Sequence, residues 1–327
     1  MSEKMCIFVV QKKIYELKQS VMDAKIDHFS ELSNFLGDKS SVCADFLSLL
    51  GRFKLGHSLS RLKMEKEKGA KSILLLEYLL IFRLCGQSIH QSLLQQFGSL
   101  VEGGKNQFYR FLTRPHMDWR RLLLATAKSF FCIVKEESVE AEQDRYFILD
   151  DTTLEKTGFC MEGISRVFDH VAQKSVLGYK LLLLAITDKK STIPVDFSLH
   201  AEAGKKKDFG LTRKQRKERF CKKRDSRDCS LKRQKELLEE KPKTAIEMLR
   251  RALKNGFVAK YLLADKWFFG KDFFHEVRNI RKGLIHIVTL LKKKDTNFMV
   301  NGKRFPAKVL ISMHERKGDF TSCRRYK

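Results

Sequence analysis

Two short apolar runs in this chain each end at an aspartate. Residues 146–149 (YFIL) run into Asp150 and Asp151, and residues 261–264 (YLLA) run into Asp265. Both runs have the composition of buried β-strands. Parallel strands present their carboxyl ends at one edge of a sheet, so these carboxylates could converge there and share divalent cations through oxygen ligands. An aspartate after a strand is also common turn chemistry. The pair, in a strongly basic chain, favours a functional interpretation.

The segments around these runs predict an α/β domain. Strands are expected in the first part and alternate with helices in the second, which indicates an antiparallel meander followed by a parallel sheet. Pro194 indicates an edge strand or a bulge. The expected strands are 163–171, 178–187, 192–200, 257–264 and 284–291, and the expected helices are 244–254 and 271–281.

The region before residue 140 predicts helices, for example over residues 106–113 and 119–131, separated by Gly103, Gly104 and Pro115. Two interpretations stay open. The short helices with basic and aromatic side chains suit a DNA-binding module of the helix-turn-helix type. They equally suit a plain helical bundle whose aromatic residues form its core.

The charge of the chain argues for a polyanionic partner. The net charge is +26, and nucleic acid is the usual partner of such a protein. A membrane surface is the less favoured alternative, because no apolar run reaches the ~18–20 residues that span a bilayer. Residues 205–235 contain 15 Lys or Arg and four acidic residues. This segment predicts either a solvated loop or a DNA contact whose affinity falls steeply with salt, and we favour the DNA contact.

Candidate DNA contacts come from this basic segment and from the helical region, and they would mostly reach phosphates. They are Lys105, Arg110, Arg120, Arg121, Lys205, Lys206, Lys207, Arg213, Lys214, Arg216, Lys217, Arg219, Lys222, Lys223 and Arg224.

The eight cysteines are scattered, and none forms a C-x-x-C pair, so the spacing of a zinc finger is absent. Reduced thiols are the simplest interpretation. The first residues lack the apolar core and cleavage site of a signal peptide, so we expect a cytoplasmic protein.

The stretch LDDTTLEKTG, with GISRVFDH, GYKLLLLAITD and IPVDFSLH after it, resembles the opening of the catalytic domain of bacterial insertion-sequence transposases of the DDE type. The resemblance covers about residues 145–291. It implies an RNase H-like catalytic domain over 145–327 with a basic insertion at about 205–240, preceded by a helical, DNA-binding region over 1–140. Asp151 matches the first family aspartate because it directly precedes threonine. Asp150 is the alternative, and Asp265 matches the second aspartate.

The resemblance also implies the chemistry. Two Mg²⁺ ions would activate the nucleophile and neutralise the transition state of DNA cleavage and strand transfer. Asp151 would bridge the ions, Asp265 would hold one, and Lys156 and Lys266 are candidates to meet a phosphate oxygen. The implied partners are double-stranded DNA, at element ends and target, and a second copy of the chain in a synaptic complex. The implied location is the bacterial nucleoid.

The third carboxylate of the family is a glutamate in a helical Y-x-x-R-x-x-x-E pattern. Glu276 follows the Asp265 strand too closely, and Glu315 lacks this pattern. We therefore expect a C-terminally truncated transposase with impaired activity. The alternatives are a non-catalytic DNA-binding remnant and a different RNase H-like nuclease that is complete as it stands. A basic RNA-associated scaffold is least favoured, since no aromatic-rich RNA motif is visible.

Overall fold

The computed structural model describes residues 51–66, 68–94, 104–137, 145–188, 190–268, 270–289, 297–300, 302–306 and 309. Leu47–Thr289 is one compact unit that contains the main sheet and the described helices. The described strands of the other unit are β7 (Asn297–Val300) and β8 (Lys303–Pro306), which pair as an antiparallel hairpin.

Helices precede the sheet, interrupt it and alternate with its last strands. They are α3 (Leu55–Arg61), α4 (Ser72–Leu84), α5 (Ile89–Ser92), α6 (Asn106–Thr113), α7 (Trp119–Glu137), α8 (Arg213–Glu218), α9 (Leu231–Glu236), α10 (Lys241–Lys254), α11 (Lys271–Asn279) and the 3₁₀ turns η3 (Lys266–Phe268) and η4 (Ile280–Gly283).

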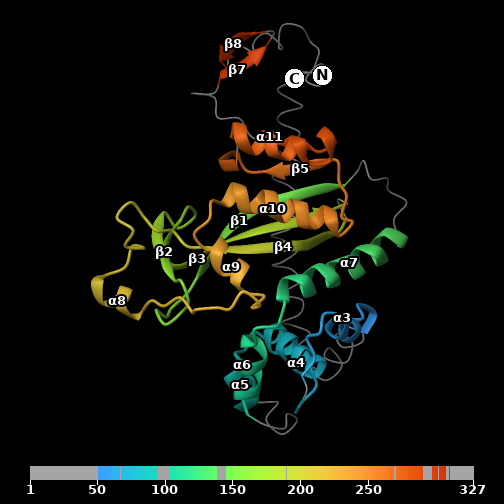
Figure 1. The fold of residues 1–327 in the computed structure, drawn as a ribbon, viewed down its shortest axis with the longest axis vertical. Helices are drawn as coiled ribbons and strands as arrows, with labels where there is room; N and C mark the ends of the chain where they lie inside the picture. The colour runs from blue at the N-terminus through green and yellow to red at the C-terminus, as the bar shows by residue number, and fades with distance from the viewer. Residues whose placement is uncertain are drawn as a thin grey trace. The chain divides into compact units, whose positions relative to one another are not determined.

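The main sheet has the RNase H-like arrangement that the sequence predicts. Its strands are β1 (Tyr146–Glu155), β2 (Ser165–Asp169), β3 (Lys174–Thr187), β4 (Thr192–His200), β5 (Tyr261–Ala264) and β6 (His286–Val288). The order is β4-β3-β1-β5-β6, with β2 paired to the first half of β3 (Figure 1). β3 runs antiparallel to β1 and β4, whereas β5 and β6 run parallel to β1.

One face of the sheet forms the hydrophobic core with α7, α10 and α11. Phe147 and Leu149 of β1 lie on this face with Leu182 and Leu184 of β3, and all four are buried. Successive side chains of a strand point to opposite faces, so Asp151 continues the row of Phe147 and Leu149. Asp150 belongs to the other face, with the half-buried Ile148.

Two details of the strands differ from or refine the sequence prediction. We expected the first strand to end at Leu149, but β1 continues to Glu155 because β3 pairs with it along its whole length. The register of β4 against β3 shifts between Leu184 and Ala185, which pair with Asp196 and Pro194, so Val195 is the extra residue of a bulge. The bulge expected at Pro194 is confirmed.

Helix α7 connects the helical region to the sheet. It packs against β4 and against α3, where the rings of Phe53 and Phe130 lie 5.5 Å apart. Ser88 begins α5 with a capping box that includes Gln91. Among the described helices, none is long and apolar enough to cross a membrane. The domain boundary near residue 140 stays a prediction.

Candidate active site

The two aspartate segments meet where β5 ends beside β1. The parallel register pairs Tyr146 with Tyr261 and ends with Leu149 opposite Ala264. Asp150 and Asp151 follow directly on β1, and Asp265 follows directly on the other strand. Because adjacent strands lie ~4.8 Å apart, the backbones of these three residues are close neighbours. Asp151 therefore lies in the middle of β1, at the point where its β5 neighbour stops.

A lysine that sequence reasoning missed contacts Asp151. Lys241, the first residue of α10, places its Nζ 2.5 Å from Asp151 Oδ2. The same Nζ lies 5.0 Å from the ring centre of Trp267, two residues after Asp265. The Asp151 side chain stays 29% exposed in this contact. Lys241 thus lies between Asp151 and the turn that contains Asp265.

Of the other residues predicted for this site, Asp265, Lys266 and Asp150 lie near Asp151 in the structure, whereas Lys156 does not. Asp265 is half-buried and accepts a hydrogen bond from the backbone N–H of Lys266, whose side chain is exposed. Asp150 accepts one from the backbone N–H of Asp151. Lys156 follows Asp151 by five residues of extended chain, so its Cα lies ~16 Å away. The structure therefore does not bring Lys156 to the two aspartates, because a lysine side chain does not span that distance.

A polar row continues from Asp151 across the sheet and becomes buried at Lys180 and His200. Thr153, Lys180 and His200 occupy matching positions on β1, β3 and β4. Lys180 Nζ donates to Thr153 Oγ1 at 2.9 Å, and His200 Nδ1 lies 3.1 Å from the carbonyl oxygen of Glu239. Burial lowers the pKa of His200. Nε2 of His200 is buried and has no hydrogen-bond partner in the part of the chain that the structure describes. These residues give the helix-covered side of the site a polar lining.

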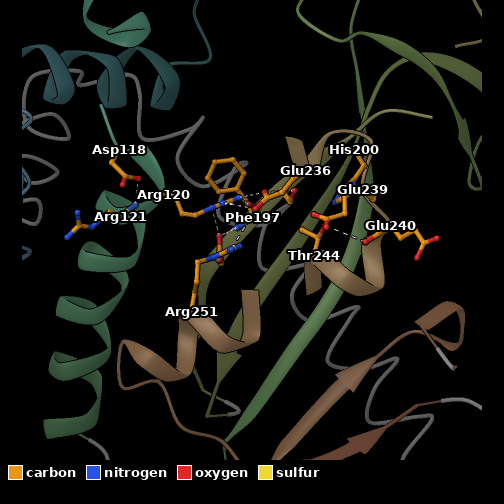
Figure 2. Close-up of polar contacts among 12 residues, drawn as sticks. Asp118, Arg120, Arg121, Phe197, His200, Glu236, Glu239, Glu240, Thr244 and Arg251 are labelled. Carbon is orange, nitrogen blue, oxygen red and sulfur yellow. Dashed lines mark hydrogen bonds and ion pairs between the residues drawn. The ribbon is translucent and has the colours of Figure 1, made fainter. Parts of the chain in front are cut away.

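A second charged cluster lies beneath α7 and α10 and is largely buried (Figure 2). Arg120 donates to both carboxylate oxygens of Glu236, at 2.9 and 2.6 Å, and to the carbonyl oxygen of Phe197. Its Nε lies 3.0 Å from Asp196 Oδ1. Arg251 completes the cluster by donating to Asp196 Oδ2 at 2.7 Å. We call Arg120, Asp196, Glu236 and Arg251 the buried ionic cluster.

This position corrects the prediction that Arg120 contacts DNA. Arg120 is 7% exposed and its guanidinium is bound by protein carboxylates. Arg121, the next residue of α7, is exposed and points away from the cluster in Figure 2. One of the two neighbouring arginines therefore has a structural position and the other remains a candidate for DNA contact.

The basic segment over 205–235 is folded. Arg219 donates to the carbonyl oxygens of Ile164 and Gly163, and its guanidinium lies 3.7 Å from the ring centre of Phe209. Arg224 binds the carboxylate of Glu162 through both of its Nη atoms. Leu211 within the segment and Leu237 just after it enter a small hydrophobic cluster. These contacts hold the segment against the Glu162–Ile164 turn.

Most of the predicted DNA contacts are nevertheless exposed. The exposed ones are Lys105, Arg110, Arg121, Lys205, Lys206, Lys207, Arg213, Lys214, Arg216, Lys217, Lys222 and Lys223.

The donors near Asp151 suit a hard cation. Carboxylate oxygens are the ligands that Mg²⁺ prefers, and it is commonly held by one or two carboxylates together with substrate phosphates and waters. Asp151 and Asp265 supply such donors from adjacent strands. In the part of the chain that the structure describes, no three Asp, Glu, His or Cys side chains gather closely enough to hold a metal on their own.

Comparison with known families agrees with this strand arrangement. The family described as DDE superfamily endonuclease matches residues 70–294, which is more than half of the chain and includes both aspartate segments. The chain belongs to the DDE superfamily of endonucleases. The match begins before α4 and continues past β6, so the family region includes α7 as well as the sheet.

Solved structures give a remote similarity. The chain is similar to a protein in the Drosophila P element transposase strand transfer complex, with 10% identity and a TM-score of 0.22. The similarity covers 74% of this chain and 55% of that one, so this chain spans about half of its length. Curated protein sequences contain no significant match.

Proposed function

We propose that this DDE superfamily endonuclease is a Mg²⁺-dependent transposase that cleaves double-stranded DNA and transfers strands at the ends of an insertion sequence. The main support for the proposal is the parallel register of β1 and β5, because it places the Asp151 segment beside the Asp265 segment. The residues around Asp151 and the family match support it.

In this proposal Asp151 and Asp265 hold Mg²⁺ and Asp150 is the alternative ligand. When bound, the metal would lower the pKa of a water or hydroxyl and neutralise charge on the phosphate. When no metal is bound, Lys241 forms an ion pair with the Asp151 carboxylate. When the metal takes this place, the Lys241 ammonium is near enough to the site to meet a phosphate oxygen of the DNA. The exposed side chain of Lys266 is a second candidate for this contact.

Double-stranded DNA is the proposed partner. The net charge of +26 and the exposed cations of the folded basic segment support this, since phosphate neutralisation dominates DNA affinity. A second copy of the chain in a synaptic complex is the assembly that the proposal implies. A non-catalytic DNA-binding role is the second candidate, and the contact between Asp151 and Lys241 favours it, because the ammonium competes with a metal ion for the Asp151 carboxylate.

The test is nicking of supercoiled plasmid DNA by the full chain with Mg²⁺. Asp151→Asn and Asp265→Asn should each abolish nicking. Asp225→Asn is the matched control, because Asp225 is an exposed carboxylate whose partners among the described residues are its neighbours Ser226 and Arg227. Nicking that survives both site substitutions would refute the proposed function. Salt-sensitive DNA binding without any nicking would refute the proposed cleavage activity and support the non-catalytic DNA-binding role.

A further inference from the structure

A basic cleft lies between α7 and the pair α9 and α10. Its volume is about 960 Å³. Six of its cationic residues come from four helices and are Arg61, Arg121, Lys232, Arg233, Arg251 and Lys254. Asp118 is the carboxylate in its described lining, and one of its oxygens already accepts a hydrogen bond from the backbone N–H of Arg121. The cleft therefore concentrates positive charge that its own acidic residue does not balance.

Two guanidinium groups in the cleft lack a full set of partners. Arg233 makes no hydrogen bond or ion pair with the described residues, although its side chain is half-buried. Burial and the neighbouring charge of Arg120 lower the pKa of Arg233. Nη2 of Arg251 is buried and has no hydrogen-bond partner among the described residues, although Nε of the same residue binds Asp196. A phosphate bound in the cleft would supply the acceptors that the half-buried guanidinium of Arg233 lacks.

We propose that this cleft binds the phosphate backbone of double-stranded DNA. Phosphates pair with guanidinium and ammonium groups through charge-assisted hydrogen bonds, which the unpaired donors of the cleft can supply. No aromatic side chain belongs to its described lining, so base stacking is not its means of recognition. Binding there is therefore independent of sequence and positions the duplex.

The cleft is separate from the aspartate site. Arg251 follows Lys241 by ten residues of α10, which is ~15 Å along a helix. A duplex of a few base pairs covers that distance, so one DNA molecule can reach both places. The inference rests on the proposed function in that DNA is the substrate, but it concerns binding and not cleavage.

The experiment measures the affinity of the full chain for a fluorescently labelled DNA duplex by anisotropy, with EDTA present and over a range of salt concentrations. The double substitution Arg233→Gln with Lys254→Gln should weaken binding about eightfold at 0.1 M salt for each phosphate that the cleft no longer neutralises. The slope of log affinity against log salt should become shallower by about 0.9 for each such phosphate. Lys174→Gln is the control, since it removes one exposed charge of β3 outside the cleft and should leave the slope unchanged.

Two further variants keep the result interpretable. Asp151→Asn should still bind the duplex although it cannot nick it, which separates this inference from the proposed nicking activity. Arg121→Gln, an exposed residue of the cleft, should weaken binding in the same direction and serves if the double variant fails to fold. Unchanged affinity and slope in folded cleft variants would overturn the inference, whatever the outcome of the nicking test.

Discussion

The carboxylate of Asp151 and those of the buried ionic cluster lie on one side of the same sheet but in opposite settings. Asp151 has one lysine partner and a side chain that is 29% exposed. Asp196 and Glu236 are held by two guanidinium groups, and their side chains are 0% and 10% exposed. The cluster contains two positive and two negative groups, so its charges are balanced within the protein.

This difference separates a structural carboxylate from one that can bind a ligand. A buried carboxylate that is fully matched by guanidinium groups is not open to a metal ion, and removal of one partner strands an uncompensated charge. The ammonium on Asp151 is a single, partly exposed partner that another cation can displace. Both carboxylate sets contact α10, through Lys241 at its first turn and Arg251 near its last.

The largest expected effect concerns Arg120. Arg120→Met leaves Glu236 and Asp196 buried with less positive charge, and it should lower the free energy of unfolding by about 3–5 kcal/mol. Chemical denaturation measures this. Arg121→Met, one residue along α7, should change it by less than about 0.5 kcal/mol because that side chain is exposed. Equal effects of the two substitutions would show that Arg120 is not structural.

The ionisation of Glu236 in the same cluster should make the free energy of unfolding depend on pH. Burial alone would raise the pKa of Glu236, but the hydrogen bond from Arg120 and the charges of Arg120 and Arg251 lower it on balance. Because its pKa is lowered in the folded state, Glu236 contributes stability that is fully present above its ordinary pKa of 4.5. This contribution is lost as the pH falls through the lowered pKa.

Wild type should therefore lose stability between pH 6 and pH 3 more steeply than Arg120→Met, in which the pKa of Glu236 returns upward. The difference should be on the order of 1 kcal/mol per unit of pKa shift removed. Urea unfolding at several pH values measures both proteins. Parallel curves would mean that Arg120 does not hold the Glu236 carboxylate in its charged form.

The smallest expected effect is at Lys241. Lys241→Met removes the competitor for Asp151 and should tighten Mn²⁺ binding by up to about fivefold, which corresponds to the energy of a partly exposed ion pair. Electron paramagnetic resonance of free Mn²⁺ measures the affinity. Lys243→Met, whose partner is the exposed Glu240, is the matched control in the same helix turn. Weaker Mn²⁺ binding by Lys241→Met would contradict competition at Asp151.

Much of this architecture could be predicted from the pattern of the sequence. The strand over 192–200 and the helix over 106–113 have the predicted bounds, and the apolar runs before Asp150 and Asp265 are neighbouring parallel strands. The length of β1 beyond Leu149 could not be predicted in the same way. Its polar residues continue as a strand because β3 pairs with them, which is a property of the sheet and not of the local sequence.

The buried cations could have been found from helical periodicity. Arg120 lies at i, with the buried Leu124, Ala127 and Phe131 at i+4, i+7 and i+11. Lys241 begins the corresponding row of Ala245, Met248 and Ala252 in α10. A cation on the apolar stripe of a helix indicates a buried partner. The identity of that partner, such as Glu236 or Asp151, depends on tertiary contacts that periodicity does not contain.

The central claim is that Asp151 and Asp265 hold one metal ion, and metal-directed cleavage of the polypeptide tests it most directly. Fe²⁺ with ascorbate and peroxide generates radicals at the bound ion and cuts the nearby backbone. The account predicts cuts near residues 151 and 265 of the same chain, both suppressed by excess Mg²⁺ and both lost in Asp151→Asn. Cuts near one aspartate alone, or cuts that persist in Asp151→Asn, would contradict it.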